Sequence, residues 1–387
     1  MRILMAQRFD IANVGCAERI WRQAEQLQQQ GHSITLVNFP HPERRRLYPR
    51  LRSDAPEGVK VLDLDRKATS IRANYYRITQ AMSEVDLVHL WKPYPDILLP
   101  ALFALGKYPK PLHYDWDDLE GGPDGVAARL TGSRMAGRLL AFWEREILNW
   151  CDTITCASEE ICRLCTKAGF PPGHLFPGPV GATIPALPEP LLRQWKHRLE
   201  GRIPLVFLGQ LETDDFPGMI LDCLPRVIAQ IPHVLLVVVG DGQARKKLEC
   251  AASNQGLASH VLFTGYVPRE EAHTILSKSS LLLFPLNDDL LSRCKSPLVV
   301  IEAMAHGIPV VASRVGEAPR MLGDAGCYVE TLNADDWAGV ILEALGSGSG
   351  LDSRGNELRQ RYLDNWTWKH SVNSLIQAYE CAMNCPL

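Results

Sequence analysis

The feature of this sequence that most restricts its fold is a regular alternation of short apolar segments with longer amphipathic ones. In the first half the apolar segments are residues 2–6, 33–39, 86–91, 111–114 and 153–157. A second series comprises residues 205–208, 234–239, 261–263, 281–284 and 309–312. Short buried strands separated by helix-length sequence are typical of βαβ units, whose strands lie side by side in a parallel sheet. The alternation therefore predicts an α/β protein.

A proline- and glycine-rich stretch, residues 171–190, separates the two series. We interpret it as a linker between two doubly wound domains, because 387 residues exceed a single domain of about 150 residues. Ligands of such domains bind outside the carboxyl ends of the strands, so functional residues are expected just after strands. The Gly/Ser-rich residues 346–350 are predicted to form a loop, and residues 366–383 a final helix.

Charge and hydropathy exclude several classes of protein. The net charge of -3 gives no general attraction to nucleic acid, so we expect no nucleic-acid partner. The longest apolar runs, residues 97–105, 234–240 and 281–286, are far shorter than the roughly 20 residues of a transmembrane helix. The first residues read as a buried strand rather than a signal peptide, which predicts a cytoplasmic protein.

The 11 cysteines are scattered along the chain and are odd in number. We interpret most of them, such as Cys223, Cys250 and Cys327, as buried free thiols. A closer group consists of Cys151, Cys156, Cys162 and Cys165. It has no second pair at the spacing of a structural zinc site, so no metal site is predicted.

The strongest single motif is residues 295–312, which read K-S-P-L-V-V-I-E-A-M-A-H-G-I-P-V-V-A. Ser296 suits the N-cap of a helix and Pro297 its first position, while Gly307 is suited to end it. The free N–H groups of the first turn, with Lys295 beside them, form a site for a diphosphate. Glu302 lies about two turns further on, where its carboxylate could accept hydrogen bonds from both hydroxyls of a ribose. A capped helix packed on a sheet is the alternative, but it does not explain a Glu among apolar neighbours.

This segment resembles the nucleotide-sugar site of the family 4 glycosyltransferases, which are retaining enzymes of the GT-B fold. That fold has two Rossmann-like domains that face each other across a cleft. Further family landmarks occur in order at residues 15–19, 30–32, 240–242, 265–267 and 366–368. The resemblance implies an acceptor domain of residues 1–180 and a donor domain of residues 190–365. It also implies that the last helix, within residues 366–387, crosses back to the first domain.

The resemblance also implies which residues contact the donor. They are Gly15, Gly209, Gly240, Asp241, Gly242, Val267, Cys294, Lys295, Ser296, Leu298, Val299, Val300 and Glu302. The Gly240-Asp241-Gly242 turn could also be mistaken for a dinucleotide fingerprint, but it lacks the third glycine of that motif. A turn of this kind can equally serve only to reverse the chain.

Three departures from the family pattern concern this donor site. Cys294 stands where the family usually has a Glu that contacts the donor sugar, and Gln210 stands where it has an Arg. The region of the usual Lys reads E-T-D-D-F-P at residues 212–217, and acids near a diphosphate repel it. Either Lys295, Arg293 or Arg314 compensates for the missing cations, or the protein transfers nothing.

In the first half, Asp115, Asp117 and Asp118 follow a predicted strand. The spacing of Asp115 and Asp117 matches the metal-binding DxD of the other large glycosyltransferase fold. We reject that match, because that fold has one domain and no helix like the one at Ser296. The resemblance implies that Asp117 or Asp118 orients the donor sugar or accepts the proton of the acceptor hydroxyl. Capping of the following loop is the alternative for some of these acids.

Residues 134–150 are predicted to form an amphipathic helix. One face carries Arg134, Arg138 and Arg145, and the other carries Leu139, Leu140, Trp143, Ile147 and Trp150. We interpret it as a helix that packs on the core and has a solvated basic face. The alternative is contact with anionic lipid or a lipid-linked acceptor at the inner face of the membrane. Five arginines could assist such contact: Arg44, Arg45, Arg46, Arg50 and Arg52.

Taken with the resemblance, these residues predict transfer of a sugar from a nucleotide diphosphate sugar to the hydroxyl of a carbohydrate or lipid-linked acceptor. Configuration would be retained, and the resemblance suggests a role in polysaccharide or glycolipid synthesis. Asp117, Asp118 and Glu302 are the expected catalytic residues. The donor is a co-substrate, and no metal or other cofactor is expected. Two alternatives stay open: a non-catalytic or degenerate nucleotide-sugar-binding partner subunit, and a nucleotide-sugar epimerase or hydrolase on the same fold.

Overall fold

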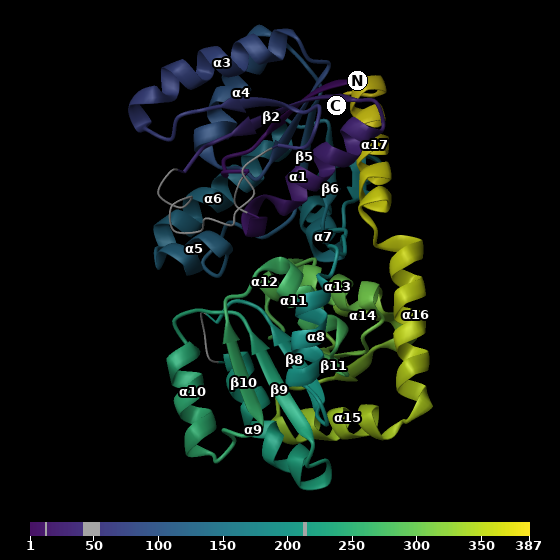
Figure 1. Cartoon of the computed structure of the whole chain (residues 1–387). Helices are drawn as coiled ribbons and strands as arrows, with labels where there is room; N and C mark the ends of the chain where they lie inside the picture. Colours follow the sequence, from purple (N-terminus) through teal and green to yellow (C-terminus); the bar gives the residue numbers. More distant parts are fainter. Residues whose placement is uncertain (12–13, 42–54, 212–214) are drawn as a thin grey trace. The chain divides into compact units, whose positions relative to one another are not determined.

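The computed structural model describes residues 1–11, 14–41, 55–211 and 215–387. The side chains of residues 14–16, 68, 215 and 217 lie outside this description. Contacts within the chain divide it into two compact units. The first comprises Met1–Gly181, Arg293–Ser296 and Trp368–Leu387, and the second comprises Ala182–Ser292 and Pro297–Thr367. Each unit carries one sheet and its own helices (Figure 1).

The first unit is built on a seven-stranded parallel sheet with the strand order β3-β2-β1-β4-β5-β6-β7. Its strands are β1 (Arg2–Ala6), β2 (Ser33–Asn38), β3 (Lys60–Asp63), β4 (Leu87–Trp91), β5 (Leu112–Trp116), β6 (Thr153–Cys156) and β7 (Leu175–Pro177). Its helices are α1 (Val14–Gln29), α3 (Ile71–Ser83), α4 (Pro95–Lys107), α5 (Val126–Thr131), α6 (Arg134–Glu146), α7 (Glu159–Lys167) and α17 (Trp368–Asn384). Short 3-10 turns are η1 (Ala68–Ser70), η2 (Ile147–Asn149) and η3 (Pro172–His174). The strand order extends in both directions from β1 and β4, which is the doubly wound arrangement.

The second unit is built on a six-stranded parallel sheet with the order β10-β9-β8-β11-β12-β13. Its strands are β8 (Ile203–Leu208), β9 (Val234–Val239), β10 (Val261–Gly265), β11 (Leu281–Phe284), β12 (Val310–Ser313) and β13 (Cys327–Val329). Its helices are α8 (Glu189–Arg198), α9 (Asp215–Gln230), α10 (Arg245–Asn254), α11 (Arg269–Ser277), α13 (Leu298–His306), α14 (Ala318–Leu322), α15 (Ala334–Gly346) and α16 (Ser349–Asn365), with the turn η4 (Gly323–Ala325). The short helix α12 (Leu290–Cys294) ends in the segment that groups with the first unit.

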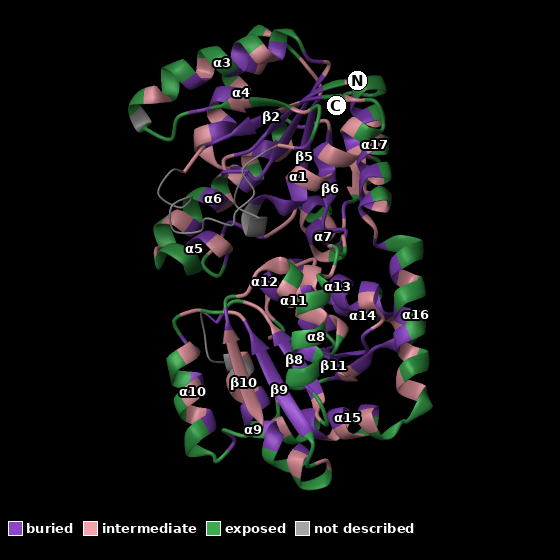
Figure 2. Ribbon diagram, viewed as in Figure 1, coloured by how far each residue is buried: buried purple, intermediate pink, exposed green. Residues whose placement is uncertain are grey.

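The alternation in the sequence correctly predicted the α/β class, and every predicted strand is present to within two residues at each end. The central strands are largely buried because helices cover both faces of each sheet. In β5 and β9 every residue is buried, whereas the outer faces of helices such as α10 and α16 are exposed (Figure 2).

Three strands were not predicted. β3 lies at a sheet edge with most of its side chains exposed, so it lacks the apolar pattern of the others. β13 is three residues long, and β7 lies inside the stretch 171–190. The interpretation of that whole stretch as a linker was therefore wrong. The predicted loop at residues 346–350 is also wrong in part, because α15 includes Gly346 and α16 begins at Ser349.

The described cysteines are all free. Cys223 and Cys327 are buried as predicted, but Cys250 is exposed on α10. Within the described residues, no helix combines the length and the apolar character that crossing a bilayer requires.

The last helix, α17, packs in the first unit. Val372, Leu375 and Ala382 belong to the same apolar cluster as strand residues of β1 and β4. Tyr379 adds a polar contact, since its hydroxyl lies 2.7 Å from Nδ1 of the fully buried His89 on β4. The C-terminal segment is therefore part of the core of this unit.

The buried His89 makes the stability of the fold depend on pH. Burial lowers its pKa to about 4, and Arg19 adds to this, against the attraction of Asp115. An unfolded chain holds imidazole at a pKa of about 6.5. The stabilisation is therefore complete above about pH 6.5 and is lost as the pH falls toward 4.

We predict that His89 makes the free energy of unfolding fall by about 2 kcal/mol between pH 7 and pH 5. Denaturant titrations at several pH values measure this dependence. His89→Gln should reduce the slope, whereas His197→Gln should not, because His197 is exposed on α8. An unchanged slope in His89→Gln would contradict the assignment.

Candidate functional site

The loops that follow β8, β9 and β10 are joined by backbone hydrogen bonds at the carboxyl end of the second sheet. Gly209 N–H donates to Val239 O at 3.0 Å, and Gly240 N–H donates to Gly265 O at 3.1 Å. Leu211 N–H donates to Asp241 O at 3.1 Å. These bonds hold the predicted donor-site loops in one rigid group.

Close packing explains why the turn after β9 contains two glycines. A Cβ on Gly240, whose φ is 139°, would lie 1.9 Å from Gly209 O. A Cβ on Gly242 would lie 2.3 Å from Leu211 O. Asp241 accepts a hydrogen bond from Gly242 N–H at 2.9 Å and its carboxylate lies 3.1 Å from an Arg245 nitrogen, so its side chain fixes the turn. The glycines are therefore required by the backbone, whatever ligand the turn contacts.

Helix α13 begins at Leu298, and Pro297 takes the N-cap position. The predicted N-cap Ser296 was wrong: its hydroxyl accepts a hydrogen bond from Val180 N–H at 3.2 Å instead. The first intrahelical bond runs from Val300 N–H to Pro297 O. The N–H groups of Leu298 and Val299 therefore precede the hydrogen-bonded ladder, and no side chain caps the helix.

The other end of α13 agrees with the prediction. Gly307 ends the helix in the left-handed conformation with φ of 71°. The apolar residues between the two ends are buried, so the helix is fixed against the sheet.

Glu302 is buried on α13, and two basic side chains of α11 contact one of its oxygens. Arg269 Nη2 donates to Glu302 Oε1 at 3.2 Å, and His273 Nε2 lies 3.2 Å from the same atom. Arg269 Nη2 also donates to Thr183 O at 3.0 Å, which fixes the guanidinium. Among the described residues, nothing forms a hydrogen bond with Oε2 of Glu302.

Sequence reasoning missed Arg269 and His273. The two are four residues apart on α11, so they lie on one face of that helix. His273 is further held by His306 at the end of α13, with 2.9 Å between their Nδ1 and Nε2 atoms. The i, i+4 spacing just after the predicted loop 265–267 was the available signal.

The structure describes Cys294 and Gln210, two of the residues that depart from the family pattern, but only part of residues 212–217. Cys294 is fully buried, and burial raises the pKa of its thiol to about 12; its contact with the donor stays a prediction. Gln210 is exposed, while Lys295 and Val267 are half-buried just before α13 and just after β10. Residues 212–214 and the side chains of residues 215 and 217 lie outside the described part of the chain.

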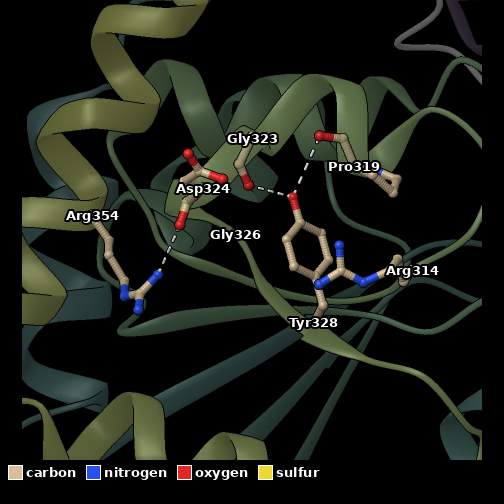
Figure 3. A pocket seen from close by; sticks show the side chains of 7 residues that line it. All are labelled: Arg314, Pro319, Gly323, Asp324, Gly326, Tyr328 and Arg354. Carbon is tan, nitrogen blue, oxygen red and sulfur yellow. Dashed lines mark hydrogen bonds between the residues drawn. The ribbon is translucent and has the colours of Figure 1, made fainter.

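Arg314, one of the proposed compensating cations, lines a cavity of about 340 Å³ beside β13 and α16 (Figure 3). Its Nε donates to Glu330 at 2.6 Å and its guanidinium lies 4.2 Å from the ring centre of Tyr328. Tyr328 donates in turn to Gly323 O at 2.6 Å, and Arg354 lies across the cavity (Figure 3). The charge of Arg314 is thus already paired at this cavity.

In the first unit, Asp115 on β5 is fully buried and serves the fold. Arg19 of α1 donates to both of its oxygens, at 2.8 and 2.7 Å. Gln23 and Thr155 donate to it at 3.0 and 2.7 Å. These donors hold the pKa of Asp115 well below its usual range, although burial opposes its ionisation. Asp115 is therefore a structural residue, in agreement with the rejection of the DxD match.

The family landmark at residues 15–19 lies within helix α1. Gly15 lies in the first turn of α1, so the helix already includes it. Residues 12–13 are outside the described part of the chain.

Asp117 and Asp118 come together with Glu120 around a lysine that sequence reasoning missed. Lys92 Nζ lies 3.2 Å from Asp117 Oδ1 and 3.0 Å from Asp118 Oδ2, and it also donates to Glu120 Oε1. The other oxygen of Glu120 accepts a hydrogen bond from Tyr94 at 2.6 Å. One ligand oxygen from each of the three acids lies within 4.8 Å of the others, which is the spacing of a metal-ion site.

Electrostatics distinguish the two aspartates. Burial raises the pKa of Asp117 to about 7, and the neighbouring Asp118 adds to the rise against the attraction of Lys92. Burial also opposes ionisation of Asp118, but Lys92 outweighs it and the pKa of Asp118 lies below its usual value. The three acids in turn raise the pKa of the buried Lys92 well above its ordinary value. Near neutral pH, Asp118 is charged and Asp117 can take up or release a proton.

Helix α6 holds the loop that follows these acids. Glu144, buried on α6, accepts hydrogen bonds from Glu120 N–H at 2.7 Å and Gly121 N–H at 3.0 Å. The helix and the loop pack closely. A Cβ on Gly121 would lie 2.3 Å from the Ala141 nitrogen, and a Cβ on Gly137 would lie 2.1 Å from Gly122 O. The inner face of α6 therefore fixes the carboxylates through backbone contacts.

The outer face of α6 corrects the sequence interpretation. Leu140 and Ile147 are buried as predicted, but Leu139 on α6 and Trp150 after η2 are exposed. The buried face of α6 is narrow, because only the side that packs on the loop of Gly121 is covered. The arginines at residues 44–52 lie outside the described residues.

Comparisons with known proteins agree with both halves of this description. The family described as Glycosyltransferase Family 4 matches residues 15–180, and the family described as Glycosyl transferases group 1 matches residues 202–347. The chain belongs to the family 4 glycosyltransferases.

Two curated relatives show which members of the family this chain is similar to. It is 29% identical over 233 residues to a GDP-mannose-dependent alpha-(1-6)-phosphatidylinositol monomannoside mannosyltransferase of Mycolicibacterium smegmatis, covering 58% of this chain and 61% of that protein. A D-inositol 3-phosphate glycosyltransferase of the same organism is 27% identical over 187 residues, covering 46% and 40%. The chain thus spans less than two thirds of the length of either relative.

The structure of Anabaena HepE in complex with UDP has a TM-score of 0.73 at 15% identity, covering 98% of this chain and 100% of that chain. Identity this low shows the fold alone. It confirms the predicted GT-B fold with Rossmann-like units in this family 4 glycosyltransferase.

We predict that Gly240→Ala destabilises the protein by at least about 2 kcal/mol, because the new methyl group clashes with Gly209 O and the backbone conformation is strained. Gly339→Ala is the matched control. Its Cβ would meet nothing within 4 Å inside α15, so it should leave stability equal or raise it by roughly 0.5–1 kcal/mol. The denaturant midpoints of the two variants and of the native protein measure these changes in stability. Equal effects of the two substitutions would refute the packing argument.

Proposed function

We propose that the chain transfers a sugar from a nucleotide diphosphate sugar to a hydroxyl acceptor with retention of configuration. The observation that carries this proposal is the state of Glu302. Arg269 donates to its Oε1 and His273 Nε2 lies 3.2 Å from the same atom, while Oε2 has no hydrogen-bond partner among the described residues. A fixed carboxylate with one available oxygen, on a helix whose first N–H groups are also available, suits a ribose and a diphosphate.

The start of α13 supplies the positive end for the diphosphate. Its leading N–H groups, on Leu298 and Val299, are not used by a side-chain cap, and the helix dipole is positive there. Lys295 lies three residues before the first residue of the helix and adds a full positive charge. We propose these groups as the stabilisers of the leaving diphosphate, with no metal or further cofactor. Gly240, Asp241 and Gly242 would shape the sugar pocket.

The acceptor hydroxyl must lose a proton as it attacks the sugar. Asp117 and Asp118 of the first unit are the proposed residues for this step or for orienting the donor sugar. The pKa of Asp117, raised by burial to about 7, suits a group that takes up a proton near neutral pH. Asp118, held ionised by Lys92, suits a hydrogen-bond acceptor for sugar hydroxyls.

The relatives suggest classes of donor and acceptor. One is named for GDP-mannose and a phosphatidylinositol mannoside, and another for an inositol phosphate. HepE has been solved with UDP and with UDP-glucose. We therefore propose a nucleoside diphosphate hexose as the donor and a sugar or lipid-linked sugar as the acceptor, in glycolipid or polysaccharide synthesis.

The first test is a thermal-shift screen with UDP, GDP, ADP, dTDP and their common sugar conjugates. A ligand at about 100 times its dissociation constant stabilises a fold by about 2.7 kcal/mol, or roughly 5–10 °C for a domain of this size. Glu302→Ala should abolish the shift, because it removes the proposed ribose contact. Glu343→Ala, an exposed Glu on α15, should keep it.

The outcomes separate the alternatives. A shift that Glu302→Ala leaves unchanged would refute the assignment of Glu302. No shift with any nucleotide favours a non-catalytic partner protein with a degenerate site. If a nucleotide-sugar donor binds and is hydrolysed or epimerised without an acceptor, the hypothesis of an epimerase or hydrolase replaces that of a sugar transferase.

We also infer that the chain contacts an anionic membrane through the outer side of α5 and α6. This α5–α6 surface is exposed (Figure 2) and consists of Arg129, Leu130, Arg134, Met135, Arg138, Leu139, Phe142 and Arg145. Met135 is 72% exposed, Leu139 51% and Phe142 52%. Large apolar side chains interleaved with arginines fit the boundary between lipid headgroups and acyl chains. Each arginine near an anionic surface adds about 1 kcal/mol of attraction.

Flotation with vesicles tests the membrane contact. We expect the protein to float with phosphatidylglycerol-containing vesicles at low salt and to dissociate at high salt. The triple variant Met135→Ser, Leu139→Ser and Phe142→Ser should lower the vesicle partition coefficient by about a hundredfold or more, since each substitution removes over about 1 kcal/mol of apolar burial. Phe103→Ser, which changes an equally exposed side chain on α4, is the control. Binding that survives the triple variant would contradict the inference.

A further inference from the structure

A buried lysine with an unusual backbone lies immediately after β4. Lys92 has φ of 64°, and it is the one non-glycine residue with positive φ in the described part of the chain. This conformation costs a residue with a Cβ about 1–2 kcal/mol, and only Gly, Asn or Asp adopt it easily. Such a conformation persists only where the surrounding structure holds the residue in place, and the polar contacts of the Lys92 side chain are those of its ammonium group.

The ammonium of Lys92 occupies the centre of three carboxylates. It contacts an oxygen of Asp117, of Asp118 and of Glu120, as described above. These oxygens lie within 4.8 Å of one another, which is the arrangement that oxygen-ligated divalent cations require. Carboxylates this close repel one another unless a positive charge lies between them.

No other described cation contacts these three acids within ion-pair distance. Arg19, another buried cation of this unit, pairs with Asp115 and donates to Gly178 O at 2.6 Å. Tyr94 donates to Glu120 but carries no charge. Arg19 and Lys295 also attract the two aspartates from beyond ion-pair distance, so Lys92 is the cation that compensates this cluster by direct contact.

We propose that Lys92 is an internal counter-ion that fills a carboxylate cage of the kind that in other proteins holds a divalent cation. Its ammonium is a positioning group, which fixes Asp117 and Asp118 without contacting the reacting atoms. This inference deepens the proposed function, since the role of the two aspartates in transfer rests on that proposal. The counter-ion role itself depends only on the contacts of Lys92.

The first experiment replaces the ammonium by an external cation. Lys92→Gly removes the charge and also relieves the left-handed backbone, so this variant retains the best chance of folding. Without divalent cations we expect its melting temperature to fall by about 5 °C or more. Mg²⁺, Mn²⁺ or Ca²⁺ at about 10 mM should restore at least half of the loss by binding the vacated cage.

The native protein and Lys60→Ala are the controls. Lys60 forms an exposed ion pair with Glu84 at 3.4 Å, so its removal changes a lysine without opening a cage. Neither control should respond to divalent cations. A folded Lys92→Gly whose melting temperature equals that of the native protein overturns the proposal, and so does one that no cation stabilises.

A double-mutant cycle tests the same idea without metal. Asp118→Asn should lower the denaturant midpoint of the native protein, because it removes a partner of Lys92. In a Lys92→Met background the same change should raise the midpoint, because it removes one uncompensated carboxylate. If Lys92→Met is insoluble, the double variant should recover soluble protein. A loss of stability from Asp118→Asn in both backgrounds, or no recovery, contradicts the counter-ion role.

These readouts are independent of turnover. If the nucleotide screen fails while the cation response and the cycle hold, Lys92 is a counter-ion and the transfer reaction is wrong. If the screen succeeds and both Lys92 experiments fail, the proposed function stands without this inference.

Discussion

The buried ion pair between Arg19 and Asp115 is the interaction on which the rest of the first unit depends. It joins α1 to β5, and the same groups bond to Thr155 on β6 and to Gly178 after β7. Burying two charges costs several kcal/mol per ion unless their hydrogen bonds are made. Here four hydrogen bonds reach the carboxylate. The pair therefore fixes the carboxyl end of the sheet, from which the turn of Asp117 and Asp118 starts two residues later.

The second unit reaches a comparable rigidity through uncharged backbone. Its loops approach so closely that Gly240 and Gly242 leave no room for a side chain, and their N–H and C=O groups are paired between loops. Beside α13 the same unit carries a buried carboxylate, Glu302, which Arg269 and His273 contact at one oxygen. A rigid apolar frame with one oriented carboxylate is suited to recognise a polar ligand, because little reorganisation is needed on binding.

Helix α6 links the two kinds of surface in the first unit. Its inner face is small and polar, with Gly137 and Glu144 against the loop that carries Glu120. Its outer face is apolar and basic at once. Large apolar side chains of α6 are exposed on its outer face. Contiguous exposed apolar patches of this kind are typical of surfaces that a partner or a membrane covers. Helix α6 thus both positions the acid cluster and forms most of the exposed α5–α6 surface.

The sequence by itself determined the α/β class, most strand positions, the helix that carries Glu302 and the run of acids after β5, because these follow from local periodicity and turn chemistry. Only the tertiary structure brought Lys92 to Asp117 and Asp118, 25 and 26 residues away, and Arg269 to Glu302, 33 residues away. The edge strand β3 and the exposed Leu139 were likewise decided by which faces found a neighbour. A sequence pattern reports which side chains can be buried or charged, but the partner that each one meets depends on the packing of distant segments.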